Sequence, residues 1–216
     1  MSDYRNSKYC PTLSDVNQKK QALVKNIKKE FPRKIDMHSV VRENNKKYKI
    51  DFMKIYNCKC AYCGVSIDIL GHISDFEIDH FKNEKSFSSK AKAGSIDNLI
   101  LACRTCNRLK SSFPINDDSK IDLHPDGREI LNNFLRDDLY NIVLSDKAKL
   151  KENVKDFYNT LDLKNETHRI DYLLINIIGL INKLDKAGYH DIYIVNELRK
   201  IKDRLLDKRK YMNKRN

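Results

Sequence analysis

The sequence has no apolar run long enough to cross a lipid bilayer. A membrane-spanning helix needs roughly 18 to 20 consecutive apolar residues, whereas the best candidate, residues 172–184, is shorter and is interrupted by polar residues. The first ten residues are polar and lack the apolar centre of a secretory signal peptide. Internal repeats and extended low-complexity tracts are also missing. We therefore expect a globular, soluble, cytoplasmic protein without membrane contact.

The six cysteines are not spaced as in a disulfide-stapled protein. Cys10 stands alone, and the others fall into two tight groups, residues 58–63 and 103–106. In a reducing compartment, paired C-x-x-C groups are more often metal sites than disulfides. Cys58 is a complication because it also lies near the first group, but only the C-x-x-C spacing lets backbone N–H groups of the turn bond the sulfurs. We predict that Cys58 and Cys10 are ordinary thiols.

The two C-x-x-C pairs, C-A-Y-C-G and C-R-T-C, are separated by 39 residues. Two such pairs can supply four thiolates to one tetrahedral Zn²⁺ and leave no open position, which is typical of a structural site. The predicted zinc ligands are Cys60, Cys63, Cys103 and Cys106.

The net charge of +12 points to a polyanionic partner, and the surplus is at the two ends of the chain. Residues 1–57 carry a net charge of +8 and residues 190–216 carry +5, whereas residues 58–126 carry −1. We interpret the two ends as the surfaces that attract a nucleic acid. Solvated helix faces that aid solubility are the alternative.

The periodicity predicts an α+β protein that is mostly α. Residues 13–31 read as a helix capped by Ser14, and residues 46–56 as a second, shorter one. Short alternating runs, scattered glycines and the clustered cysteines at 58–114 favour a β-hairpin followed by a helix. The rest of the chain is predicted to form helices at 128–136, 146–160, 166–186 and 191–210. The third of these is apolar nearly all round and is expected to be buried.

Chemistry-bearing residues lie between and beside the cysteine pairs. Glu77-Ile78-Asp79-His80 precedes a loop, Asn98 precedes the second pair, and Asn107 follows it directly. A neutral imidazole can deprotonate water near pH 7. One carboxylate and one amide can hold Mg²⁺ or Mn²⁺ with positions left open for phosphate oxygens and water. Adjacent strand residues point to opposite faces, so Asp79 and His80 can serve metal and water separately.

Four segments in order, C-A-Y-C-G, E-I-D-H, D-N-L and C-R-T-C-N-R-L-K, resemble the zinc-containing branch of the HNH endonucleases. The resemblance covers about a quarter of the chain. It implies a ββα-metal core at residues 58–115, braced by zinc. The basic helical N-terminal region, 1–57, and a C-terminal helical domain, 116–216, would flank this core.

The resemblance assigns a role to each matching residue. His80 takes the position of the general base, Asp79 and Asn107 those of the ligands of the catalytic ion, and Asn98 that of the residue that orients the loop. Glu77 is expected to be solvated or to support the ligands, and a metal-binding role is the alternative. The family often has a proline two or three positions after the histidine, which this chain lacks. The residues expected to face phosphate are Arg104, Arg108 and Lys110.

The resemblance implies a metal-dependent endonuclease that cuts DNA and leaves a 5′-phosphate and a 3′-hydroxyl, with RNA open as a substrate. A non-catalytic zinc-ribbon module that binds nucleic acid is the alternative. The helical flanks also look like those of HNH subunits of bacterial anti-phage systems, Septu-like or retron-associated. That looser likeness implies an antiviral defence role and an ATPase partner subunit, and a homodimer is a further option.

Overall fold

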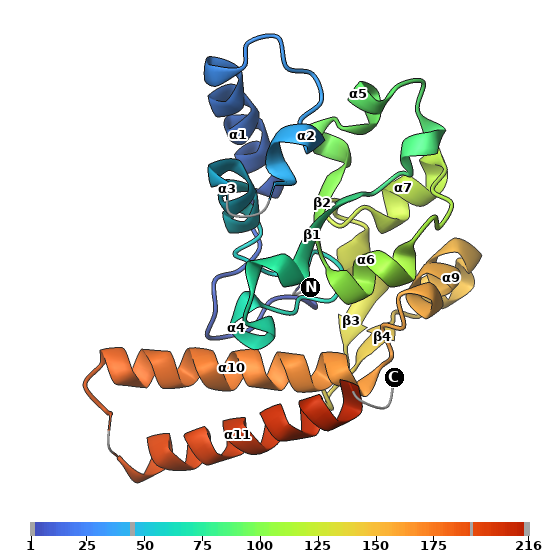
Figure 1. Ribbon diagram of the computed structural model, residues 1–216. Coiled ribbons are helices and arrows are strands. Elements are labelled where there is room, and N and C mark those ends of the chain that lie inside the picture. Colours follow the sequence, from blue (N-terminus) through green and yellow to red (C-terminus); the bar gives the residue numbers. More distant parts are fainter. Residues whose placement is uncertain (1–2, 44–45, 191, 214–216) are drawn as a thin grey trace.

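The computed structural model describes residues 3–43, 46–190 and 192–213. Two short strands near the middle of the chain are surrounded by helices, and a long helical hairpin lies along one end of the molecule (Figure 1). The expected α+β, mostly helical class is confirmed. The elements are α1 Val16–Glu30, α2 His38–Val41, α3 Lys47–Ile55, α4 Ile67–Leu70, β1 Phe76–His80, α5 Lys90–Ala93, β2 Leu99–Cys103, α6 Arg104–Lys110, α7 Asp117–Leu123, α8 Ile130–Asn133, β3 Phe134–Arg136, β4 Ile142–Leu144, α9 Glu152–Thr160, α10 Glu166–Lys186 and α11 Tyr193–Asn213.

The predicted hairpin-and-helix unit is present. Strands β1 and β2 are antiparallel, with Phe76 opposite Cys103 and His80 opposite Leu99. All five residues of β2 are buried, as expected for an apolar strand covered on both faces. Helix α6 begins at the residue after β2 and packs on both strands. The chain therefore brings the second cysteine pair, at the β2–α6 junction, beside the start of β1.

The N-terminal helices are tied to the strands by two buried lysines. The Nζ of Lys20 in α1 donates to the Leu99 carbonyl at 2.6 Å and pairs with Asp126 at 2.5 Å. The Nζ of Lys49 in α3 donates to the Phe76 carbonyl at 2.8 Å. Buried ammonium groups need partners of this kind, because an unpaired buried charge is costly. These bonds fix α1 and α3 against the β1–β2 unit.

Helix α1 begins later than predicted. Its N-cap is Asp15, which has a left-handed backbone and makes no side-chain capping bond, so the predicted cap at Ser14 is wrong. The reason is the preceding segment: the Asn6 side chain accepts a hydrogen bond from the N–H of Leu13 at 2.8 Å. This bond holds residues 13 and 14 outside the helix.

The segment before α1 lies across the first cysteine pair. The Tyr4 hydroxyl donates to the carbonyl of Tyr62, and the Arg5 guanidinium donates to the carbonyl of Ala61 at 2.7 Å. A second Arg5 bond reaches the carbonyl of Pro125 at 2.9 Å. Residues at the start of the chain therefore close the loop that carries Cys60 and Cys63.

The predicted helix at 128–136 is wrong in its second half. Only Ile130–Asn133 is helical, and Phe134–Arg136 pairs with Ile142–Leu144 in a second antiparallel hairpin. The turn between the strands is closed by Asp137, whose carboxylate accepts the N–H groups of Leu139 and Asn141. Such side-chain-to-backbone bonds favour a turn over continued helix.

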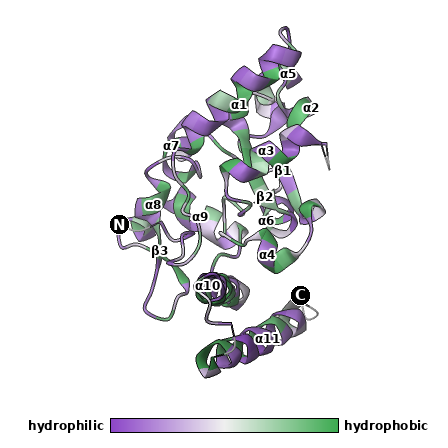
Figure 2. Cartoon of the chain, turned by 90° about the vertical axis from the view of Figure 1, so that its left-hand side faces the viewer, coloured by the Kyte–Doolittle hydropathy of each residue, from purple (hydrophilic) through white to green (hydrophobic). Residues whose placement is uncertain are grey.

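Helices α10 and α11 pack against each other and lie to one side of the strands in both cartoon views (Figures 1 and 2). We expected the apolar α10 to be buried all round, but Leu173, Ile177 and Leu184 are only half-buried. Residue 191, where the last helix was predicted to begin, lies outside the described residues, and α11 runs over Tyr193–Asn213. Among the helices described, none has the length and apolar character that a membrane span requires.

Candidate functional site

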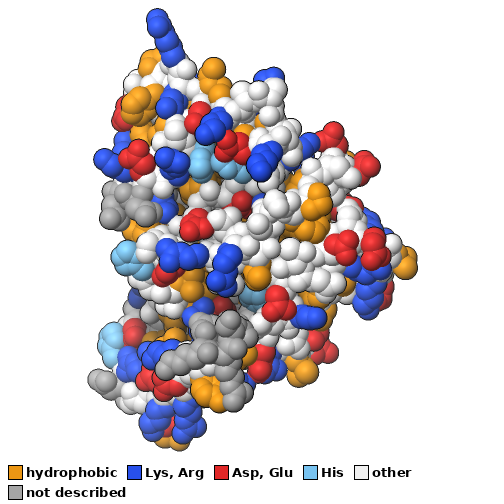
Figure 3. Space-filling view, turned by 45° about the vertical axis from the view of Figure 1, so that its right-hand side comes forward, with side chains coloured by type: hydrophobic (Ala, Val, Ile, Leu, Met, Phe, Trp, Pro, Cys, Tyr) orange, Lys and Arg blue, Asp and Glu red, His pale blue; other side chains and the backbone are white. Residues whose placement is uncertain are grey.

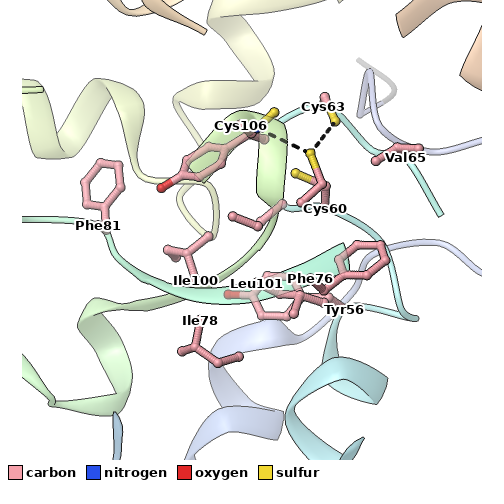
Figure 4. Close-up of a cluster of buried hydrophobic side chains, with 14 of the residues drawn as sticks. Tyr56, Cys60, Cys63, Val65, Phe76, Ile78, Phe81, Ile100, Leu101 and Cys106 are labelled. Carbon is pink, nitrogen blue, oxygen red and sulfur yellow. Dashed lines mark hydrogen bonds between the residues drawn. The ribbon is translucent and has the colours of Figure 1, made fainter. Parts of the chain in front are cut away.

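The four predicted zinc ligands converge. The Sγ atoms of Cys60, Cys63, Cys103 and Cys106 all lie within 4.8 Å of one another, and all four residues are buried. The Sγ atoms of Cys63 and Cys103 are 3.9 Å apart, close to the edge of ~3.8 Å expected for a tetrahedron with Zn–S bonds of about 2.3 Å. Figure 4 shows Cys60, Cys63 and Cys106 turned toward one another beside the apolar side chains of the two strands.

Local backbone geometry presents the thiolates. In the first pair the N–H of Gly64 bonds to the Cys60 carbonyl at 2.9 Å, and Gly64 has a φ of 81°, which favours glycine. In the second pair the Cys103 Sγ accepts the N–H of Cys106 at 3.4 Å, so Cys103 is the N-cap of α6. The donor set, four thiolates with no open position, fits a structural metal ion. The cysteines outside the cluster, Cys10 and Cys58, are free thiols.

His80 ends β1 and lines an open cavity of about 220 Å³ with Asp36, His38, Arg42, Glu84 and Lys90. The ring of His38 contacts the ring of His80 in a tilted arrangement, with 4.2 Å between centroids and 52° between the ring planes. His38 is itself held at 3.3 Å from the carbonyl of Ile78. The imidazole of His80 is therefore half-buried and fixed on one side, while the other side faces the cavity.

The surroundings of His80 favour its neutral form. Burial lowers the pKa of His80, the carboxylates of Glu84 and Asp36 raise it in part, and Lys110 lowers it further. Burial and the neighbouring His80 likewise lower the pKa of His38. An imidazole that is neutral at physiological pH can accept a proton from water.

Asp79 lies on the side of β1 opposite to His80, and its carboxylate is bound by other side chains. Its side chain is 8% exposed and pairs with the Lys110 ammonium, which is 2% exposed, at 3.0 Å. The Tyr62 hydroxyl donates to the same carboxylate at 2.6 Å. Burial raises the pKa of Asp79, and Lys110 and Tyr62 oppose that rise. The structure does not place Asp79 in contact with Asn107.

Asn107 meets Glu77 instead. Its Nδ2 donates to Glu77 Oε2 at 2.6 Å. Both side chains line a cavity of about 290 Å³ together with Arg42, Lys49 and Arg104. Arg42 also lines the cavity of His80, so the two cavities share this residue.

Asn98 holds the loop that follows His80. It accepts the N–H of Lys82 at 2.9 Å and donates to the carbonyls of Lys82 and Ala93 at 3.0 and 2.9 Å. Its own carbonyl accepts the N–H of Phe81 at 2.8 Å. These bonds fix the backbone directly after His80 in a chain that has no proline there.

The three basic residues expected to face phosphate have separate environments. Lys110 is buried against Asp79, and its Nζ also donates to the His80 carbonyl at 3.0 Å. Arg104 is exposed and donates to the Ser74 carbonyl at 2.8 Å. Arg108 lines a different cavity of about 340 Å³ beside α10. The face shown in Figure 3 mixes basic, acidic and histidine side chains and carries no single basic patch.

Sequence reasoning missed His38 and Arg42. Neither lies near a motif, and both are brought to the site because α2 packs against α3, which is bonded to β1. His124 bonds the Asp97 carbonyl at 3.0 Å and meets the Phe81 ring edge-on, which are structural contacts.

One comparison with known proteins gave a match. No curated protein and no solved structure matches the chain. The family model described as HNH endonuclease matches residues 60–113. That segment begins at the first thiolate of the cluster and contains β1, β2, α6 and His80. Residues 60–113, one quarter of the chain, therefore match the HNH endonuclease family.

Proposed function

We propose that the protein is a metal-dependent endonuclease that hydrolyses phosphodiester bonds of DNA, with His80 as the general base. The observation that carries this proposal is the environment of His80, which lies in the segment that matches the family. Its imidazole has a lowered pKa, contacts His38 and lines an open cavity.

The residues of the two cavities account for activation of the water and for phosphate binding. His80 removes a proton from a water molecule as the water oxygen bonds to phosphorus and the bond from phosphorus to the 3′ oxygen breaks. The leaving oxygen takes a proton from solvent, which leaves a 3′-hydroxyl and a 5′-phosphate. Arg42, which lines both cavities, is placed to hold a phosphate oxygen.

Two metal ions fit the donor sets. Zn²⁺ suits the four buried thiolates. A hard Mg²⁺ or Mn²⁺ suits Asn107 with a carboxylate of β1, either Asp79, as the family pattern implies, or Glu77. Bound there, the ion would supply positive charge to the phosphate as the leaving oxygen becomes negative.

The test is cleavage of supercoiled plasmid by the zinc-loaded chain with Mg²⁺ or Mn²⁺. Wild type should convert the plasmid to open-circular or linear DNA, and His80→Ala should lose that activity. His72→Ala is the matched control, because the exposed ring of His72 bonds to Ser74 within its own turn. A wild type that binds DNA but cuts no faster than His80→Ala would favour the zinc-ribbon binding module instead.

A further inference from the structure

The turn at the start of α2 lies against the loop between β1 and β2 at Gly94. The carbonyl of Gly94 accepts the N–H groups of Met37 and His38, at 2.9 and 3.3 Å. Met37 is also buried, which anchors the turn in the core. Helix α2 lies near α5, the short helix that ends before Gly94, in both cartoon views (Figures 1 and 2). We call residues 36–42, which include His38 and Arg42, the active-site arm.

Gly94 occupies a position where no side chain fits. A Cβ there would lie 2.0 Å from Oδ1 and 2.9 Å from Cγ of Asp36, whereas non-bonded carbon atoms pack about 3.5 to 4.0 Å apart. The φ of Gly94 is −76°, which any residue can adopt, so the contact with Asp36 is what requires glycine. The Asp36 carboxylate can give way only by breaking a bond, because its Oδ1 accepts the N–H of Ser39 at 3.2 Å.

The loop that carries Gly94 is held by Asn98. Asn98 Nδ2 donates to the carbonyl of Ala93, directly before Gly94, and to the carbonyl of Lys82, two residues after His80. One side chain therefore ties the two ends of this loop together. The position of Gly94 is set relative to the backbone that follows His80.

The active-site arm brings two side chains to the cavity of His80. The His38 ring lies 4.2 Å from the His80 ring, between centroids, and its Nε2 lies 3.3 Å from the Ile78 carbonyl. Arg42 lines the cavity of His80 and the adjoining cavity. Both side chains come from outside residues 60–113, the segment that matches the family.

We propose that Gly94 is the seat of the active-site arm and acts through it as a positioning residue for the reaction at His80. This inference rests on the proposed nuclease function. Seated on Gly94, the arm holds His38 against the imidazole of His80 and keeps Arg42 at the cavity that would receive phosphate. Displacement of the arm would free the base to turn and would remove a phosphate contact, so both kcat and KM should change.

The first measurement tests the seat without DNA. In zinc-loaded full-length protein with isotope-labelled histidines, the ring protons of His38 and His80 should give a nuclear Overhauser effect, since the rings are in contact. Gly94→Ala should lose this effect, because the methyl group takes the place of the Asp36 carboxylate. Asp36→Ala leaves the main-chain bonds to Gly94 in place and should keep it. The double variant should keep it as well, because the methyl group then fills the space that the carboxylate leaves.

The second measurement is plasmid cleavage by the same proteins. Gly94→Ala should lower kcat and raise KM by up to about tenfold each, from the loss of the ring contact and of a charge-assisted phosphate bond. The double variant should return both constants to those of Asp36→Ala. Gly71→Ala is the matched control, since Gly71 has a φ of 92° and nothing within 4 Å of a Cβ. That variant should lower the melting temperature through backbone strain and leave kcat, KM and the ring contact unchanged.

Four results would overturn the seat: an intact ring contact in Gly94→Ala, a lost contact with wild-type kcat and KM, an equal loss of activity in Gly71→Ala, or a double variant as impaired as Gly94→Ala. If Gly94→Ala alone does not fold, a folded double variant with the ring contact supports the seat, and an unfolded one overturns it. A ring contact that depends on Gly94 in a protein whose wild type cuts no DNA would refute the nuclease proposal and leave the seat of the arm standing.

Discussion

The two ends of the β1–β2–α6 unit carry sites of opposite character. At one end, four identical side chains converge in a buried cluster with every coordination position filled by protein. At the other, His80 lines an open cavity that shares Arg42 with the cavity of Glu77 and Asn107. The first arrangement holds the fold together, and the second leaves room for a substrate. Substitutions in the cysteine cluster should therefore lower stability, whereas substitutions at the His80 cavity should lower activity.

The largest effect is expected at the closed end. Cys106→Ser removes one of four thiolates from a fully buried cluster. Structural zinc contributes apparent binding energies of about 10 to 16 kcal/mol, comparable with the whole stability of a domain, about 5 to 15 kcal/mol. The variant should lose zinc and its cooperative thermal transition, as measured by metal analysis and calorimetry. Cys58→Ser, outside the cluster, should keep both; equal behaviour of the two variants would contradict a four-thiolate site.

At the open end, a change of pH should alter activity without altering the fold. The general base must be neutral, and burial lowers the pKa of His80 below its ordinary value of about 6.5. The pH profile of kcat/KM should therefore be flat near neutrality and fall as the pH drops through a value below about 6.5. His80→Ala should lose roughly 10²- to 10⁴-fold and the acidic limb with it. An acidic limb centred above pH 7 would argue against this histidine.

The ion pair between the two sites should behave as a buried structural element. Lys110→Met leaves the Asp79 carboxylate buried without its cation, and a loss of about 3 to 5 kcal/mol in the free energy of unfolding is expected. The double variant Asp79→Asn with Lys110→Met should recover part of that loss, since it removes the uncompensated charge. Denaturant titration of wild type, Lys110→Met, Asp79→Asn and the double variant measures the coupling energy between the two residues. Additive losses in the double variant would show that the pair is not coupled.

The smallest effect is expected for His38, which supports the base from outside the matched segment. Aromatic rings in contact contribute about 0.5 to 1.5 kcal/mol, so His38→Ala should lower kcat by up to about tenfold while KM for DNA stays unchanged. His72→Ala is the control. A loss in His38→Ala as large as that in His80→Ala would instead make His38 a catalytic residue.

The sequence predicted the cysteine cluster fully and the surroundings of His80 only in part. Four cysteines in two C-x-x-C pairs define their own geometry, so spacing alone located the cluster. The roles of His80, Asn98 and Asn107 were predicted through the family motif and stay predictions. The environments of Glu77 and Asp79 were not, because Tyr62 and Lys110 reach Asp79 only in the folded chain.

The limits of the fold prediction have a similar cause. The 3.6-residue period located α10 at its observed bounds, 166–186, because a long periodic segment is a strong signal. The β3–β4 hairpin was not predicted because each strand has three residues, too few for an alternating pattern. The positions of His38 and Arg42 beside His80 were not predicted because they depend on the packing of α2 against α3.

The contact of Arg5 with Pro125 sets an order on synthesis. Synthesis runs from the N-terminal side, yet Arg5 cannot complete its bonds over the first cysteine pair until residue 125 has emerged. The backbone carbonyl of Tyr4 accepts from Arg136, which appears later still. Tyr4 and Arg5 are thus made before the first cysteine pair but complete their contacts only after residues 125 and 136, and a ribosome stalled before residue 125 would hold residues 60–113 without that closure.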